Sequence, residues 1–114
     1  ARIEEKILFD ADKLDVTGCT GIARSLLYIG QVGTPLYSLD AAGAVSDGSR
    51  DEQPSFFQEY HYKLKGLYSL FYTERGRELA RERQSAADSF YRSLLQEVSS
   101  AYRSGPQDLL RFLQ

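Results

Sequence analysis

The stretch ILFDADKLDVTGCTGIAR, residues 7–24, decides the fold class, because it holds a helix, a break and the start of another helix. Apolar residues recur there at helical spacing and predict a first helix over residues 2–16. Gly18 and Gly21 predict a short break. The mostly apolar run that follows predicts a second helix ending near Gly30.

The rest of the chain predicts one long loop and further helices. Residues 31–54 are rich in Gly, Pro, Ser and Asp and read as a loop. Pro54 suits the first position of a third helix that ends near Tyr72. Thr73 suits the cap of a fourth helix reaching about Tyr102, after which a short amphipathic helix restarts. No segment alternates with a period of two, so an all-α fold of about five helices is predicted.

Composition narrows the class of protein. The chain has 114 residues, enough for one domain or a piece of one. Its net charge of −2 gives no basic surface for a nucleic-acid polymer or an anionic membrane. The apolar runs are too short to span a bilayer, and the single cysteine, Cys19, suits a reducing compartment. We therefore expect a cytoplasmic protein. Because the helical pattern begins at Ala1 without a methionine, we expect a fragment of a longer chain.

The acids of the first helix differ in their surroundings on a helical wheel. Asp10 falls beside Lys6 and Lys13, which predicts a surface salt bridge. Asp12 falls between apolar side chains on both flanks, which predicts a buried carboxylate. A buried carboxylate must be paired, protonated or bound to a metal. At this point Asp12 is either paired, for example with Arg24, or a metal or catalytic residue.

Residues 7–24 resemble the last conserved segment of bacterial HD-domain phosphohydrolases, which typically reads Ile-Leu-x-Asp-Ala-Asp-Lys/Arg-Leu-Asp-Ala-x-Gly-x-x-Gly-Ile-Ala-Arg. The resemblance continues in GTPLY (33–37), YHYKLKGL (60–67) and YTERGRELARER (72–83). It implies an HD-domain-like helical bundle, incomplete at its N-terminus. Residues 1–114 would then be the C-terminal portion of a single HD-type domain.

The same resemblance implies a metal site. In the family a His, a His-Asp doublet and a distant Asp hold a divalent ion, and the distant Asp corresponds to Asp12. Carboxylate and imidazole ligands suit Mn, Fe, Co, Ni or Zn, and Mg less well. Asp15 would orient a ligand, or solvate the turn at Gly18, and Arg24 would pair with Asp15 or reach a substrate phosphate. The first three ligands would lie upstream of this chain, and its one histidine, His61, is expected to be a packing or surface residue rather than a metal ligand.

The resemblance implies a metal-dependent phosphohydrolase that acts on a phosphate ester or anhydride of a small molecule, most simply a nucleotide. The chain by itself is expected to be inactive, since one carboxylate does not make a metal site. The loop 31–54 would lie near the mouth of the pocket. The alternative is a non-catalytic helical module for interaction or oligomerisation, including a homo-oligomer. Its support is the load of 8 Tyr and 6 Phe, several of them around the predicted third helix.

Overall fold

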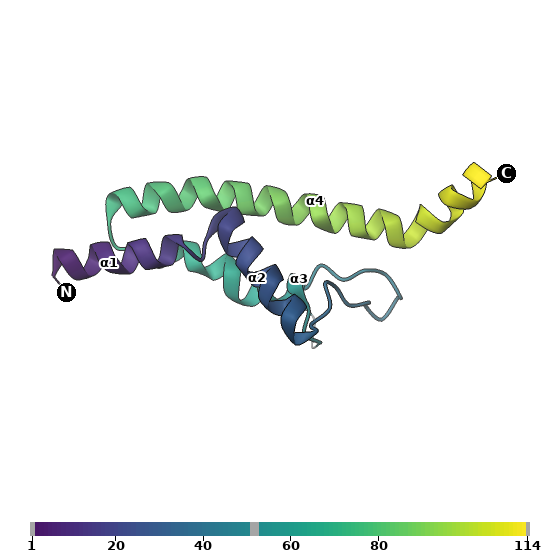
Figure 1. Cartoon of the computed structure of the whole chain (residues 1–114), viewed down its shortest axis with the longest axis horizontal. Coiled ribbons are helices and arrows are strands. Elements are labelled where there is room, and N and C mark those ends of the chain that lie inside the picture. Colours follow the sequence, from purple (N-terminus) through teal and green to yellow (C-terminus); the bar gives the residue numbers. More distant parts are fainter. Residues whose placement is uncertain (1, 51–52, 114) are drawn as a thin grey trace.

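The fold is all-α, as predicted. We describe a computed structural model, which places the backbone of residues 2–50 and 53–113 and the side chains of residues 2–50 and 53–102. In these ranges four α-helices are joined by turns and by one long loop (Figure 1). No helix in the described part of the chain is both long enough and apolar enough to cross a membrane, in line with the short apolar runs.

Helices α1 (Ile3–Leu14) and α2 (Gly18–Val32) are separated by a break of only three residues. The predicted break at Gly18 and Gly21 is wrong, because both glycines lie inside α2. Gly18 has a φ of +64°, and a Cβ atom on it would lie 2.9 Å from the Cβ of Arg83. Glycine is used here for its left-handed backbone and its lack of a side chain, so the helix starts where the sequence pattern predicted an interruption.

The third helix is shorter than predicted and begins later. Ser55, not Pro54, precedes it, and the Ser55 hydroxyl accepts a hydrogen bond from the backbone N–H of Gln58. The chain then passes through three short pieces: α3 (Phe56–Glu59), the π-helical turn η1 (Tyr60–Leu64) and the 3-10 turn η2 (Lys65–Ser69). The spacing of the backbone hydrogen bonds therefore changes twice, from α to π and from π to 3-10, in a segment that the sequence pattern predicted to be one continuous α-helix.

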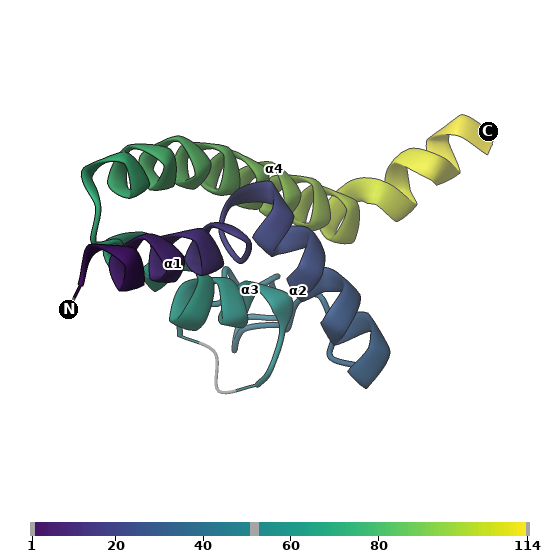
Figure 2. The same ribbon diagram turned by 60° about the vertical axis from the view of Figure 1, so that its left-hand side comes forward.

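Helix α4 (Glu74–Leu113) is the longest element. Thr73 caps it as predicted, because its hydroxyl accepts a hydrogen bond of 2.9 Å from the Gly76 N–H. The predicted end near Tyr102 is wrong, since the helix continues through Pro106 without interruption. Proline removes one helical hydrogen bond and favours a kink. Figure 2 shows the last turns of α4 leaving the direction of the rest.

The core lies where α2 and α3 meet α4. Its buried side chains include Phe57, Tyr60 and Tyr91, with Tyr60 and Tyr91 stacked at 4.3 Å between ring centroids. Three aromatic residues of the predicted third helix therefore have structural roles: Phe57 and Tyr60 in the core, and Tyr68, which accepts a hydrogen bond from the Gly18 N–H. Tyr62 remains 62% exposed.

Candidate metal-binding face of helix α1

Asp12 lies on the exposed side of α1. The sequence predicted that it would be buried, and that expectation is wrong for this chain. The wheel placed apolar neighbours around Asp12 correctly, but one of them, Leu8, is itself 66% exposed. Nothing in the described part of the chain covers this face of the helix. The Asp12 carboxylate has no hydrogen bond or ion pair with any described residue, so its oxygens are available to a ligand.

Asp15 and Arg24 lie together at the junction of α1 and α2. Asp15 follows the last residue of α1, one turn beyond Asp12, and its side chain is also exposed. An Nη1 hydrogen of Arg24, from α2, points to the backbone carbonyl of Asp15 at 3.4 Å. Arg24 therefore contacts the backbone rather than the carboxylate of Asp15. All three residues predicted for the site are exposed, and both carboxylates are unpaired within the described residues.

Asp10 is the buried acid of α1, at 4% exposure. The predicted salt bridge with Lys6 and Lys13 is wrong. Its carboxylate instead accepts hydrogen bonds from the N–H of Tyr72 at 2.9 Å, the N–H of Thr73 at 2.8 Å and the Thr73 hydroxyl at 2.5 Å. These donors lie at the N-terminus of α4, where a helix leaves N–H groups unpaired and favours negative charge.

The surroundings of Asp10 keep it ionised. Burial on its own would raise the pKa of the carboxyl, but the hydrogen bonds from Thr73 and Tyr72, with the nearby charge of Arg77, outweigh burial and lower it. Gly76 makes this contact possible, since a Cβ atom on it would lie 2.3 Å from Asp10 Oδ2. Asp10 thus joins α1 to the start of α4, a role that the wheel did not reveal.

Asp10 and Asp12 therefore do different things although one residue separates them. Two positions along an α-helix rotate a side chain by roughly 200°. One carboxylate faces α4 and is used by the fold, and the other faces away from it and is free. Among the carboxylates between residues 8 and 15, only Asp12 and Asp15 remain for chemistry.

The described residues do not make a metal site on their own. No group of three or more His, Cys, Asp or Glu side chains that would suit an ion occurs in the part of the chain that the structure describes. His61 cannot supplement Asp12, because its Nε2 atom lies 2.9 Å from the hydroxyl of Tyr91 in the core. His61 therefore packs against Tyr91, which is one of the two roles expected for it. Asp12 and Asp15 offer hard oxygen donors, so further ligands have to come from outside the described residues.

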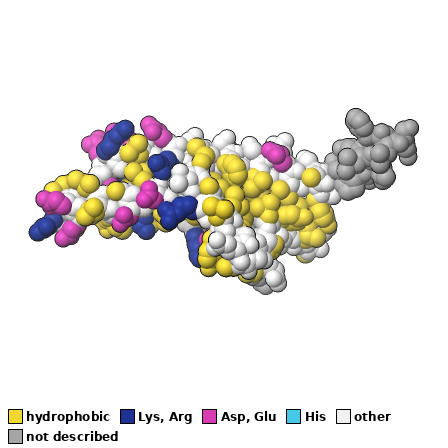
Figure 3. Space-filling view, in the orientation of Figure 1, with side chains coloured by type: hydrophobic (Ala, Val, Ile, Leu, Met, Phe, Trp, Pro, Cys, Tyr) yellow, Lys and Arg dark blue, Asp and Glu magenta, His cyan; other side chains and the backbone are white. Residues whose placement is uncertain are grey.

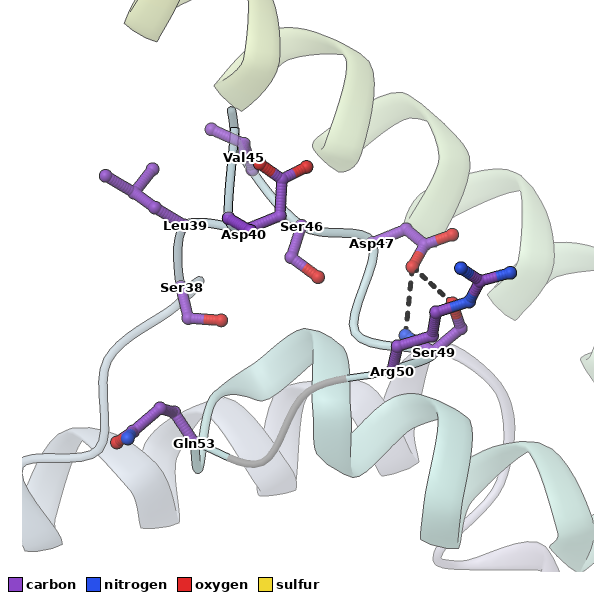
Figure 4. Close-up of a pocket in the computed structure, with 10 residues that line it drawn as sticks. Ser38, Leu39, Asp40, Val45, Ser46, Asp47, Ser49, Arg50 and Gln53 are labelled. Carbon is purple, nitrogen blue, oxygen red and sulfur yellow. Dashed lines mark hydrogen bonds between the residues drawn. The ribbon is translucent and has the colours of Figure 1, made fainter. Parts of the chain in front are cut away.

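The loop that follows α2 lines an open hollow of about 850 Å³, with both polar and apolar side chains around it (Figure 4). The Asp47 carboxylate accepts hydrogen bonds from the N–H and hydroxyl of Ser49, and these bonds lower the pKa of Asp47. The Tyr91 hydroxyl donates to the backbone carbonyl of Asp47 and so fastens the loop to α4. Among the described residues that line the hollow, Asp12, Asp15 and Arg24 are absent. A place for the loop at the mouth of the Asp12 site stays a prediction.

Comparison with known proteins gives this geometry a context. No family model matches the chain. The YpgQ protein of Bacillus subtilis is 35% identical over 96 residues, which are 84% of this chain and 40% of YpgQ. The crystal structure of YpgQ matches with a TM-score of 0.70 and 33% identity, over 86% of this chain and 46% of that one. An HD-superfamily hydrolase from Bacillus thuringiensis matches with a TM-score of 0.68 and 30% identity, over 83% of this chain and 46% of that one. The chain is therefore similar to one portion of the HD-superfamily hydrolase structure.

The match covers most of this chain but less than half of each relative. The chain spans somewhat less than half the length of these HD-superfamily structures, while most of the chain itself is covered. A further structure in the set is YpgQ in complex with ADP, which matches with a TM-score of 0.67 and 32% identity. The resemblance predicted from residues 7–24 is therefore confirmed at the level of the fold. More than half of each relative has no counterpart here.

Proposed function

We propose that residues 1–114 are the C-terminal portion of a single HD-type domain, and that the whole protein is a metal-dependent phosphohydrolase. The observation that carries the proposal is the match to HD-superfamily hydrolases at 30% identity and a TM-score of 0.68, combined with a free carboxylate at Asp12. A hydrolase that keeps one unpaired carboxylate on an exposed helix face has a ready oxygen ligand for a divalent ion.

Asp12 is the last ligand of the proposed site, and the other ligands belong to a part of the protein outside this chain. Its neighbour Asp10 is excluded as a ligand, because the carboxylate already accepts three hydrogen bonds at the start of α4. Asp15 lies one turn beyond Asp12 and is suited to orient a ligand by a hydrogen bond. Mn, Fe, Co, Ni, Zn and Mg all remain candidates for the ion.

The chemistry divides between the ion and the chain. A divalent ion supplies Lewis acidity toward a phosphoryl oxygen and lowers the pKa of water. The exposed carboxylate of Asp12 supplies negative charge that holds the ion in place. The Arg24 guanidinium, exposed and only weakly held by the Asp15 carbonyl at 3.4 Å, is free to turn toward a phosphate group of the substrate. Arg24 would thus bind and orient the substrate.

A nucleotide is the substrate class that the comparisons favour. YpgQ, which matches over 84% of this chain, was crystallised with ADP. The hollow in the loop of residues 33–55, at about 850 Å³, falls in the range of about 300–1,000 Å³ typical of small-molecule pockets. We propose that this loop adds contacts that select among small phosphate esters or anhydrides.

The decisive experiment begins with the coding DNA on both sides of the Ala1 codon. The reading frame that contains residues 1–114 is expressed whole and assayed for phosphate and pyrophosphate release from nucleoside di- and triphosphates, with Mn²⁺, Co²⁺, Mg²⁺ or EDTA. Asp12→Asn is expected to abolish both metal binding and activity. Glu97→Gln, an exposed acid on α4, is the matched control and is expected to leave both unchanged. A reading frame without a His and a His-Asp doublet, or an active Asp12→Asn enzyme, refutes the proposal.

A second function, a non-catalytic interaction or oligomerisation module, is favoured by one observation. Helix α2 presents Leu27, Tyr28 and Val32 at exposures of 72%, 61% and 54%. Apolar side chains so exposed on one helix are typical of an interface. A metal-free, inactive full-length protein that stays oligomeric on dilution, as measured by light scattering, would favour this function over hydrolysis.

A further inference from the structure

The start of α2 receives no cap from the residue that precedes it. Thr17 stands at the N-cap position, where a threonine hydroxyl commonly accepts a hydrogen bond from an N–H group of the first turn. Here the Thr17 hydroxyl is turned back and donates to the Leu14 carbonyl of α1 at 2.9 Å, so it makes no capping bond. The first N–H groups of α2 therefore need an acceptor from elsewhere in the fold.

The acceptor comes from a residue 50 positions further along the chain. The Tyr68 hydroxyl, on η2, accepts a hydrogen bond of 2.9 Å from the N–H of Gly18, the first residue of α2. Burial raises the pKa of Tyr68 above its ordinary value of 10.0 and outweighs the bond from Gly18, which lowers it. The phenol therefore stays neutral at physiological pH, and its bond to the start of α2 does not depend on pH in that range.

The junction between α1 and α2 is closely packed around this bond. A Cβ atom on Gly21 would lie 2.3 Å from the carbonyl oxygen of Val16, so the short linker lies directly against the first turn of α2. Gly18 approaches Arg83 of α4 almost as closely. Because the linker and the first turn are in contact, a shift at the start of α2 also moves the linker, whose first residue is Asp15.

The start of α2 also determines where Arg24 lies. Helix geometry fixes the offset between two positions on one helix, so the place of Gly18 sets the place of Arg24. Arg24 is in the second turn of α2, and its Nη1 atom donates across the junction to the Asp15 carbonyl at 3.4 Å. Figure 3 shows most of the acidic and basic side chains of this face over α1 and the first part of α4. The junction at the end of α1 therefore borders the charged part of the molecule.

We propose that Tyr68 is a positioning residue of the phosphohydrolase site. Its hydroxyl holds the start of α2 and, through that helix, holds Arg24 in place relative to Asp12 and Asp15. Tyr68 acts only through Arg24 and touches neither the ion nor the substrate. The role of Arg24 toward a phosphate group rests on the proposed function, whereas the effect of Tyr68 on the place of Arg24 requires no catalysis.

The test is a double-mutant cycle in the whole protein, with the nucleoside triphosphate that it hydrolyses fastest. Tyr68→Phe removes the hydroxyl and keeps the ring. It is expected to raise KM about threefold to tenfold with kcat nearly unchanged, because substrate binding by Arg24 weakens. In an Arg24→Ala background the same change should leave KM within about twofold. A purely stabilising tyrosine would lower the midpoint of urea denaturation and leave the KM of the folded enzyme unchanged.

Tyr72→Phe is the matched control. The Tyr72 side chain is 53% exposed, and its hydroxyl has no hydrogen bond with any described residue. This variant should keep the KM of the unaltered protein. Nuclear magnetic resonance of the same proteins, without substrate or metal, gives a readout that needs no activity. Tyr68→Phe should move the Nε–H resonance of Arg24 and speed hydrogen exchange at the Gly18 amide, and Tyr72→Phe should do neither.

The outcomes separate this inference from the proposed function. In an active protein, an unchanged KM for Tyr68→Phe, or the same rise with and without Arg24, refutes only the positioning role. An inactive protein in which Tyr68→Phe still moves the Arg24 resonance refutes only the proposed function. An unmoved Arg24 resonance overturns the positioning role whether or not the protein is active.

Discussion

Replacement of Asp10 by alanine is predicted to destabilise the fold far more than replacement of Asp12. Asp10→Ala removes three hydrogen bonds to one buried carboxylate, two of them from backbone N–H groups at the start of α4. Hydrogen bonds to a charged group contribute about 1.5–3 kcal/mol each, less where water replaces them. Loss of a helix cap costs about 1 kcal/mol.

The net loss is smaller than the sum of these bonds. Tyr72 and Thr73 are not fully buried, so water recovers part of their hydrogen bonding, and alanine favours the helix by a few tenths of a kcal/mol. We expect a fall of about 2–4 kcal/mol in the free energy of unfolding. Asp12→Ala is expected to change it by less than about 0.5 kcal/mol, since the side chain is exposed and unpaired among the described residues.

Urea denaturation followed by circular dichroism measures both variants under the same conditions. With an unchanged m-value, Asp10→Ala should lower the midpoint and Asp12→Ala should leave it in place. Equal effects of the two substitutions, or a loss below about 1 kcal/mol for Asp10→Ala, would refute our account of how α1 is attached.

The pH dependence gives an independent check of the same contact. The pKa of Asp10 is lower in the folded chain than the ordinary value of 3.8, because its hydrogen bonds and Arg77 outweigh its burial. The unfolded chain therefore takes up the proton first as acid is added. The stabilisation by Asp10 is complete above about pH 4 and is lost as the pH falls through the folded value. Asp10→Asn is expected to lack this part of the acid-induced loss.

Three further substitutions test contacts elsewhere. Gly76→Ala should cost about 1–3 kcal/mol by urea denaturation, although alanine is the better helix former, because its Cβ would lie 2.3 Å from Asp10 Oδ2. Gly30→Ala should stabilise α2 by about 0.5–1 kcal/mol in the same assay, since its Cβ would meet nothing within 4 Å. Tyr91→Phe removes the hydrogen bond to the Asp47 carbonyl, together with the contact to His61 Nε2, and should cost about 1–2 kcal/mol. It should also speed amide hydrogen exchange in the loop of residues 33–55, and unchanged exchange would exclude the fastening role of Tyr91.

The sequence predicted the helical class and several local features because these depend on neighbouring residues. The spacing of apolar residues located α1, and the type of residue at Thr73 predicted the cap of α4. The failed boundary at Gly18 depends on a distant contact. Gly18 starts a helix because its N–H meets the Tyr68 hydroxyl, 50 residues away, and no local pattern contains that information.

The assignments of the two acids failed for a different reason. A helical wheel treats every apolar flank as buried, so it placed Asp12 in the interior beside Leu8. It cannot register that a face lacks a covering element, nor that Asp10 finds its donors at residues 72 and 73. The role of Asp12 as a ligand came from the family resemblance and remains a proposal.

The way α1 is attached has a consequence for recognition. Besides the Asp10 contact, the Leu14 carbonyl at the C-terminal end of α1, one turn beyond Asp10, accepts a hydrogen bond from Arg83 of α4. A helix bonded at one point can pivot, whereas a helix bonded at two points keeps its orientation. Helix α1 therefore has little rotational freedom to lose when a partner arrives, and the entropy cost of association falls mainly on the partner. The direction of Asp12 is preorganised before any ligand is present.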